Sequence, residues 1–309
     1  MKRSKGQGQI GVLMGGISAE REISLRTGEA IVKALRGRGY DVCPIDVSYD
    51  VAERLISEQI PVAFIALHGR FGEDGTIQGM LEIMRIPYTG SGVLASALSM
   101  DKIMSKRIFA AHAIPTPASR ILQATAGVKE AVQKLNFPFP MVVKPASEGS
   151  TIGVTIVHDK EGLAQAIEHA RQYDHRLLLE EYIKGKEITL GVLNGQTLPI
   201  IEIAPKGGLY DYRAKYTKGE TEYILPPSIP PKTHEDAERI GLGAYMALGC
   251  EGCARVDMMA DEKGESFVLE VNSMPGMTET SLVPKAAHFA GVDFPELVER
   301  ILRGASLKA

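Results

Sequence analysis

Cysteine is scarce in this sequence, with three residues in 309. A small and odd number of cysteines argues against a disulfide framework. Cys250 and Cys253 form a C-x-x-C pair, but the sequence has no second pair to complete a zinc site. The pair also does not open a helix after a first strand, as thioredoxin-like redox pairs do. We therefore expect buried or half-buried thiols without a chemical role.

The sequence also lacks a strong charge of one sign and a long apolar run. The net charge is −3, which gives no reason to expect nucleic acid or an anionic membrane as a partner. No apolar stretch approaches the roughly 18 residues that a membrane-spanning helix needs. The basic residues 1–5 are followed by glycines and by an apolar stretch too short for a signal peptide. We expect a cytoplasmic protein.

The first hundred residues contain an alternation of strand and helix patterns. Hydrophobic spacing predicts strands and helices in turn at residues 10–14, 20–35, 41–47, 51–57 and 62–67. This βαβ order indicates an open parallel sheet, which binds ligands beyond the carboxyl ends of its strands. Glu20 and His68 both lie at that edge, although each residue taken alone fits better as a helix-start carboxylate and a loop histidine, respectively.

The remaining sequence continues to mix the two patterns. A compact α+β unit is expected from the helices and strands predicted at residues 101–111, 120–122, 128–135, 141–144, 154–157, 161–171 and 177–181. Asn194-Gly195 then predicts a tight hairpin between strands at 187–193 and 196–204. The polar stretch 205–225 has the length of a lid or binding loop. Helices are expected at 234–248, 282–290 and 294–303.

Two strands predicted near the carboxyl end, 253–259 and 267–271, carry oxygen ligands. Because side chains alternate along a strand, Arg255 and Asp257 should share one face, and Val268, Glu270 and Asn272 should share a face of the partner strand. If the two faces coincide, two carboxylates and an amide oxygen converge, which suits Mg²⁺. A polar hairpin face exposed to solvent is the alternative that this spacing leaves open.

A loop of small residues, 148–153, lies between two predicted strands and follows Lys144. Glycine N–H groups and hydroxyls can bind phosphate, and a lysine adds a point charge. The loop is not a P-loop, because it lacks the G-x-x-x-x-G-K motif between a strand and a helix, and a plain hairpin turn fits equally well. The strand connection from Glu180 to Glu187 could offer backbone groups to an adenine edge.

In their order along the chain these groups resemble the ATP-grasp superfamily and, more narrowly, the D-alanine–D-alanine ligases. The resemblance runs from about residue 10 to the C-terminus. It is carried by segments 15–24, 66–69, 72–75, 87–91, 210–216 and 273–278, and by Met100-Asp101-Lys102, Arg255-Val256-Asp257 and Glu270-Val271-Asn272.

The resemblance implies an α/β protein of three-domain ATP-grasp architecture. Its expected parts are an N-terminal substrate-binding domain with an open parallel, Rossmann-like sheet (1–100), a central ATP-grasp subdomain (101–183) and a C-terminal ATP-grasp subdomain with the metal site and lid loop (184–309). It further implies ATP-dependent joining of two D-alanines through D-alanyl phosphate, for peptidoglycan precursors. Two Mg²⁺ ions, or Mn²⁺ in their place, and a homodimer are implied as well.

The resemblance also assigns roles to individual residues. Lys102, Lys144 and Lys215 would bind the ATP phosphates, with Thr151 of the small-residue loop beside them. Glu180, Tyr182 and Ile183 would bind the adenine, and Glu187 would bind the ribose. The implied metal ligands are Asp257, Glu270 and Asn272.

Of the two substrate amino acids, the first D-alanine would be bound by Glu20 and His68, and the second by Ser281 and Leu282. Arg255 and the N–H of Gly276 would form the oxyanion site. Ser150 and Tyr216 would link to Glu20 around the second amine.

The sequence departs from the family pattern at Tyr182, Leu209 and Glu279-Thr280. Tyr216 favours an amine over D-lactate as the second acceptor, because relatives that make D-alanyl-D-lactate lack this tyrosine. A dinucleotide-dependent oxidoreductase is suggested by the first βαβ unit and Asp46, but the turn lacks G-x-G-x-x-G. A non-catalytic nucleotide-binding regulator would not need Arg255.

Overall fold

The computed structural model describes residues 8–123, 136–149, 151–208, 210, 214, 217 and 219–308. The first part is a parallel sheet of order β2-β1-β3, in which Ile10 lies opposite both Val42 and Val62. Its elements are β1 (Ile10–Gly15), α1 (Arg21–Gly37), β2 (Val42–Val47), α2 (Val51–Ser57), β3 (Val62–Ile65), α3 (Thr76–Ile83) and α4 (Val93–Met100). The predicted open parallel sheet is confirmed. Helices α3 and α4 were not predicted, because each has only eight residues, which is short for recognising a helical period.

The second part is an antiparallel sheet of order β4-β7-β5-β6. It follows helix α5, and α7 packs against it through Leu163 and Ile167. The elements are α5 (Lys102–Ala111), β4 (Ser119–Gln123), β5 (Met141–Pro145), β6 (Thr155–Val157), α7 (Lys160–Ala170) and β7 (Arg176–Glu181). The helix predicted at 128–135 lies outside the described residues.

The third part is a second antiparallel sheet of order β11-β10-β8-β12-β13, with β9 paired to β8. Its elements are β8 (Gly185–Leu193), β9 (Gln196–Thr197), β10 (Ile201–Pro205), β11 (Thr221–Ile224), α9 (Pro231–Ala247), β12 (Cys253–Asp261), β13 (Ser266–Asn272), α10 (Leu282–Phe289) and α11 (Phe294–Arg303).

The predicted hairpin turn is confirmed, since Asn194 and Gly195 both have the positive φ that such a turn needs. A continuous return strand over 196–204 is wrong. The strand breaks between β9 and β10, where Pro199 has no N–H to donate to a ladder. Strand β11 lies within the stretch predicted as a polar loop, where its pairing with β10 supplies the order that the sequence pattern does not show.

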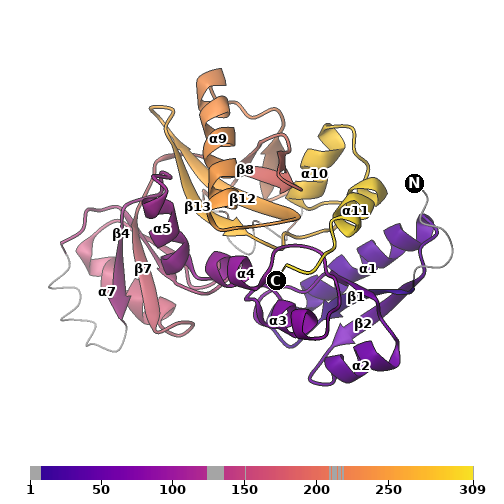
Figure 1. The fold of residues 1–309 in the computed structure, drawn as a ribbon. Helices are drawn as coiled ribbons and strands as arrows, with labels where there is room; N and C mark the ends of the chain where they lie inside the picture. Colours follow the sequence, from indigo (N-terminus) through magenta and orange to yellow (C-terminus); the bar gives the residue numbers. More distant parts are fainter. Residues whose placement is uncertain are drawn as a thin grey trace.

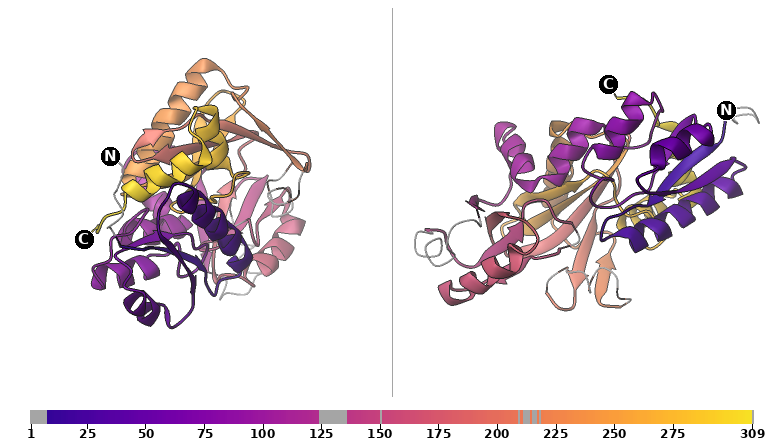
Figure 2. Two further views of the ribbon diagram at one scale, coloured as in Figure 1. Left: turned by 90° about the vertical axis from the view of Figure 1, so that its right-hand side faces the viewer. Right: turned by 90° about the horizontal axis from the view of Figure 1, so that it is seen from below.

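The carboxyl-terminal helices return to the first sheet. Figures 1 and 2 show α11 beside α1, and Leu297 and Ile301 of α11 share a core with Ile10 and Ile31. In the opposite direction, Ala95 of α4 joins the core under the third sheet. This packing fixes the starts of α1 and α10 relative to the β12–β13 hairpin.

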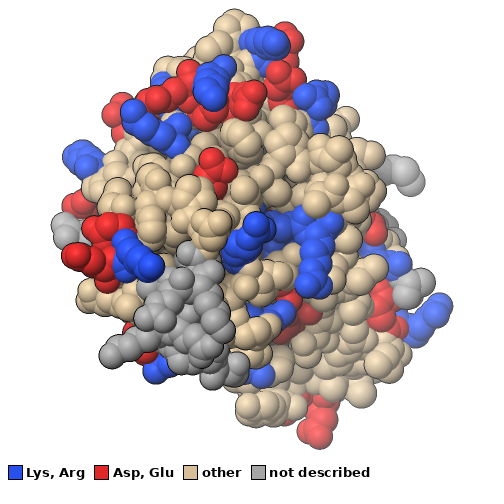
Figure 3. Space-filling model, turned by 90° about the vertical axis from the view of Figure 1, so that its left-hand side faces the viewer, with Lys and Arg blue, Asp and Glu red and all other residues tan. Residues whose placement is uncertain are grey.

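The cysteines are free, and Cys250 and Cys253 are buried, as expected. Burial raises the pKa of Cys253 to about 12, which keeps it a protonated and poor nucleophile at neutral pH. Among the described residues, no helix is long and apolar enough to cross a bilayer. On the face shown in Figure 3, acidic and basic side chains are interspersed along the upper edge.

Candidate active site

Two cavities, of about 240 and 340 Å³, adjoin at Tyr210 and Glu270, which line both. The smaller cavity is lined by residues from the starts of α1 and α10 and from the loop after β3, together with Arg255. The larger lies between the second and third sheets and contains Lys102, Lys144 and Asp257. We call them the amino-terminal cavity and the intersheet cavity.

The predicted carboxylate hairpin lies on the boundary between the two cavities. Asp257 is opposite Glu270 and Arg255 is opposite Asn272 in the β12–β13 ladder. Asn272 Nδ2 donates to Asp257 Oδ2 over 3.0 Å, and Thr189 Oγ1 donates to Oδ1 over 2.6 Å. The two polar faces therefore coincide. Arg255 lines the amino-terminal cavity, Asp257 the intersheet cavity, and Glu270 both.

Strict alternation along β13 is wrong at one point. The register shifts between Asp257 and Met258, so that Met258 faces Val268 and Leu269 is left as an extra residue. Such a β-bulge moves the following side chains to the other face. Val268 therefore lies in the core with Val271, not on the face of Glu270 as predicted, while Leu269 lines the intersheet cavity.

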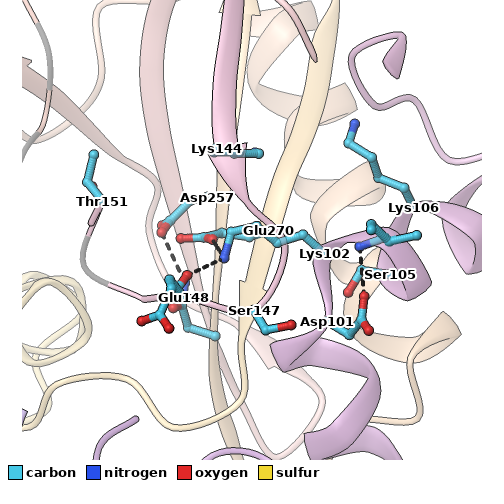
Figure 4. Close-up of polar contacts among 12 residues, drawn as sticks. Asp101, Lys102, Ser105, Lys106, Lys144, Ser147, Glu148, Thr151, Asp257 and Glu270 are labelled. Carbon is cyan, nitrogen blue, oxygen red and sulfur yellow. Dashed lines mark hydrogen bonds and ion pairs between the residues drawn. The ribbon is translucent and has the colours of Figure 1, made fainter. Parts of the chain in front are cut away.

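The acidic groups of the hairpin are neutralised by two cations. Arg255 grips Asp257 with Nε and Nη2, at 2.9 and 2.8 Å. Lys102 Nζ lies 3.0 Å from Glu270 Oε2 and donates to the carbonyl of Glu148 over 2.8 Å (Figure 4). Burial alone would lower the pKa of Arg255 and of Lys102, but Asp257 and Glu270 respectively outweigh it and raise both. Both cations are therefore charged at neutral pH.

The side chains of the hairpin fit a hard cation whose remaining ligands are oxygens of water or phosphate. Across the described part of the chain, no group of three or more His, Cys, Asp or Glu side chains is placed to hold a metal by itself. Asp257 and Glu270 supply two carboxylates and Asn272 an amide, and Mg²⁺ usually takes one or two carboxylates and completes its shell with water and phosphate. The ion pairs of Arg255 with Asp257 and of Lys102 with Glu270 show that the surroundings of these carboxylates stabilise positive charge.

Deeper in the intersheet cavity, the buried carboxylate of Glu180 lies between two lysines. Lys144 Nζ is 2.5 Å from Oε2, and Lys106 Nζ is 2.8 Å from Oε1. Burial pushes the pKa of Glu180 up, but Lys144 and Lys106 outweigh it and hold that pKa below its usual value. Sequence reasoning missed Lys106. Its spacing of four residues from Lys102 on α5, which places both on one helix face, was the available signal.

The other residues predicted for ATP lie around the same cavity. Its lining includes Thr151, Tyr182, Ile183 and Glu187. Thr151 Oγ1 donates to the carbonyl of Tyr210, and so joins the small-residue loop to the segment before β11. The sequence assigned no role to Tyr210 beyond its place in the family segment 210–216. Tyr210 lines both cavities and contacts Tyr223, with 3.0 Å between the hydroxyls.

Glu20 and His68 meet in the amino-terminal cavity, as their positions after strand ends predict. Glu20 is the N-cap residue of α1, but its side chain makes no capping bond and lies against Gly69. A Cβ at Gly69, whose φ is +70°, would come within 2.7 Å of the Glu20 carboxylate. His68 Nε2 is 3.1 Å from Thr27 Oγ1, and Nδ1 is 3.4 Å from Glu73, a residue to which sequence reasoning gave no role.

Gly276, Ser281 and Leu282 line the far side of this cavity. Ser281 is the N-cap of α10 but makes no side-chain cap bond, and its Oγ accepts instead from the N–H of Thr278 over 3.1 Å. A helix start presents N–H groups that suit a carboxylate. Ser150, Leu209, Lys215 and Tyr216 lie outside the described residues, so their roles stay predictions.

Two family models and many curated relatives match this chain. The family described as D-ala D-ala ligase C-terminus matches residues 110–303, and its N-terminal counterpart matches 50–91. A D-alanine–D-alanine ligase of Syntrophotalea carbinolica is 53% identical over 302 residues, which cover 98% of this chain and 97% of the relative. One of Geotalea uraniireducens is 50% identical over 300 residues, covering 97% and 96%.

A crystal structure of the D-alanine–D-alanine ligase of Bacillus anthracis, complexed with ATP, is 37% identical to this chain and superposes with a TM-score of 0.83. The match covers 96% of this chain and 97% of the other. The ATP-grasp architecture expected from the sequence is confirmed by this match. Family, fold and length agree throughout, and the chain belongs to the D-alanine–D-alanine ligase family.

Proposed function

We propose that this protein joins two D-alanines to D-alanyl-D-alanine and converts ATP to ADP and phosphate in the process. It is an ATP-dependent carboxylate–amine ligase that serves peptidoglycan synthesis. The observation that carries the proposal is the pair of cavities that adjoin at Glu270, with Arg255 on one side and Lys102 and Lys144 on the other. A small amino-acid site thus adjoins a larger, lysine-lined one.

The reaction begins with activation of a carboxylate, which is a poor electrophile. ATP in the intersheet cavity transfers its terminal phosphoryl group to the first D-alanine and gives D-alanyl phosphate. Phosphoryl transfer depends on positioning and charge neutralisation. Lys102, Lys144 and Lys215 neutralise the phosphates, while Tyr182, Ile183 and Glu187 hold the nucleoside.

Asp257, Glu270 and Asn272 would hold two Mg²⁺ ions, or Mn²⁺ in their place, beside the phosphates. When bound, the ions supply neutralisation of the transferring phosphoryl group. Because Arg255 grips Asp257 and Lys102 grips Glu270, the hairpin carboxylates stay paired with cations before the metal arrives. The site therefore carries little uncompensated negative charge toward an incoming polyphosphate.

The second step takes place in the amino-terminal cavity. Glu20 attracts the ammonium of the first D-alanine with His68 near its carboxylate, and the start of α10 at Ser281 receives the carboxylate of the second. The amine of the second D-alanine attacks the acyl phosphate, and phosphate leaves. Arg255 and the N–H of Gly276 stabilise the tetrahedral oxyanion, each contributing about 3 kcal/mol by the usual effect of one such donor.

Several wider expectations join the proposal. The chain divides at about residues 100 and 183, and the stretch 207–225 closes over the reacting groups to keep water from the acyl phosphate. Ser150 and Tyr216 act with Glu20 around the second amine. The protein is cytoplasmic and forms a homodimer.

Coupled measurement of ADP release tests the proposal. D-Alanine with Mg²⁺ should support turnover and yield D-alanyl-D-alanine, whereas L-alanine and D-lactate should not, and EDTA should stop the reaction until Mg²⁺ or Mn²⁺ is restored. Turnover without peptide product, or a preference for D-lactate, would contradict it.

A further inference from the structure

The charge cluster Lys106–Glu180–Lys144 is buried beside the intersheet cavity, and the roles proposed above make no use of Lys106. The side chain of Lys106 is 6% exposed and that of Glu180 is 3% exposed. A buried carboxylate needs a counter-charge, because the loss of one partner leaves a charge without solvent or counter-ion. Glu180 has two such partners, which differ in their surroundings.

Lys106 is held by two hydrogen bonds and one ion pair. Its Nζ donates to Thr116 Oγ1 and to the carbonyl of Pro117, each over 2.7 Å, and forms an ion pair with Glu180 Oε1 at 2.8 Å. Two of the three N–H donors of the ammonium are therefore used by acceptors other than Glu180. Thr116 itself donates to the carbonyl of Val268 in β13, which connects Lys106 to the β12–β13 hairpin. Lys106 is not among the residues that line the intersheet cavity.

Lys144 differs, because it lines the intersheet cavity and, of its contacts with described residues, the structure gives a side-chain ion pair with Glu180 alone. A nucleotide phosphate in that cavity attracts the Lys144 ammonium. When Lys144 turns toward the phosphate, it no longer neutralises the negative charge of Glu180. Lys106, held by Thr116 and Pro117, stays in place.

We propose that Lys106 is a positioning residue for ATP: it holds the charge of Glu180, so that Lys144 is free to bind the nucleotide. This inference rests on the proposed function only in taking the intersheet cavity as the ATP site. Without Lys106, Lys144 is the sole cation on a buried carboxylate, and a phosphate must compete with Glu180 for it. The effect then falls on nucleotide binding and leaves D-alanine binding unchanged.

The test compares Lys106→Met and Lys106→Arg with wild type in the full-length protein. Isothermal titration with ADP, in the absence of D-alanine, and the KM values for ATP and D-alanine are the readouts. Lys106→Met should weaken ADP binding and raise the KM for ATP on the order of 10- to 50-fold, with the KM for D-alanine within about twofold, a loss of the size expected for a charged hydrogen-bonded partner. Lys106→Arg should recover most of the loss.

Lys308→Met is the matched control. The Lys308 side chain is also 6% exposed and ion-paired, to Glu251, but lines neither cavity. It should lower the unfolding temperature without altering ADP binding. An equal loss of ADP affinity in both variants would show a general structural effect and overturn the proposal.

The double variant Lys106→Met/Glu180→Gln gives the sharpest outcome, and it removes the buried charge that could unfold the single variant. Because Glu180 is itself assigned to adenine, the reference is the single variant Glu180→Gln. With no carboxylate to compete for Lys144, the double variant should bind ADP within about fivefold of Glu180→Gln alone. A double variant that unfolds cooperatively but binds ADP at least about 10-fold more weakly than Glu180→Gln alone would overturn the proposal. A wild type that binds ADP but forms no D-alanyl-D-alanine would refute the proposed function and leave this test intact.

Discussion

The two cavities of the site are built in different ways. In the intersheet cavity, the charged groups stand on strands and at the start of α5, and they are paired with each other, as in Lys102–Glu270 and Lys144–Glu180. In the amino-terminal cavity, apart from Arg255 and Glu270 of the shared hairpin, the polar groups stand on loops and at the starts of α1 and α10, where Glu20 and Ser281 lie. One half is a charge network set by strand register, and the other is a gathering of helix starts.

The geometry of the intersheet cavity comes from strand register, and that of the amino-terminal cavity comes from helix packing. Opposite residues of an antiparallel pair have Cβ atoms about 5 Å apart, so the ladder alone brings Asp257 next to Glu270. Nothing local relates Glu20 to Ser281. Their proximity depends on the packing of α10 and α11 against α1 and the first sheet. Substitutions should therefore affect nucleotide chemistry in one half and D-alanine binding in the other.

The largest effect is expected from Asp257→Asn. The change removes the carboxylate that would hold the metal and leaves the Arg255 guanidinium without its counter-ion. We expect kcat to fall on the order of 10³-fold, as when charge stabilisation of a transition state is lost, while the protein stays folded. Steady-state assays at saturating Mg²⁺ with circular dichroism measure both.

Asp261→Asn is the matched control for this variant, because it lies on the same strand and its carboxylate accepts from the turn N–H groups of Lys263 and Glu265. Its kcat should stay within about twofold of wild type. A kcat near that of wild type in Asp257→Asn would contradict the assignment of Asp257 as a metal ligand.

A smaller and differently distributed effect is expected from Glu20→Gln. The neutral side chain no longer attracts an ammonium, so the KM for the first D-alanine should rise about 100-fold, the scale of a lost charge-assisted bond. ADP binding, measured by titration, should not change. Exposed Glu22, one residue into α1, provides the control Glu22→Gln. An equal loss of D-alanine and ADP binding would erase the distinction between the two halves.

The smallest effect is expected from Glu299→Gln, which loosens the contact of α11 with α1. Glu299 accepts from Tyr40 and Arg38, and the hydrogen bond from Tyr40, with Arg303 and Arg38, holds its pKa below the usual value. Because the folded pKa is lowered, the carboxylate stabilises the fold above its unfolded pKa, near 4.3, and this contribution is lost as pH falls through the folded pKa.

Thermal unfolding from pH 7 down to about pH 3 checks this prediction. Glu299→Gln should unfold a few degrees below wild type at pH 7, for a loss of up to about 1 kcal/mol, and the gap should close in acid. Glu296→Gln is the control, since Glu296 pairs with Arg300 on its own helix. A gap that persists unchanged at low pH would contradict the charge-based account.

Much of the fold could be predicted from local pattern. The parallel sheet, the hairpin at Asn194-Gly195 and helix α11 follow from spacing and turn chemistry. The misses have physical causes. The bulge at Leu269 responds to pairing with β12 and leaves no mark on the sequence of β13. Pro199 interrupts the run that was predicted as one strand, and β11 is ordered by its neighbour β10.

The sequence by itself determined the family, the strand pair that carries Asp257, Glu270 and Asn272, and the positions of Glu20 and His68 beyond strand ends, because these depend on short-range spacing. Only the tertiary structure decided that Lys106 and Lys144 share the buried Glu180, and that the starts of α1 and α10 face each other across one cavity. The reason is that desolvation and packing act between segments far apart in the chain, and no local pattern encodes how those segments meet.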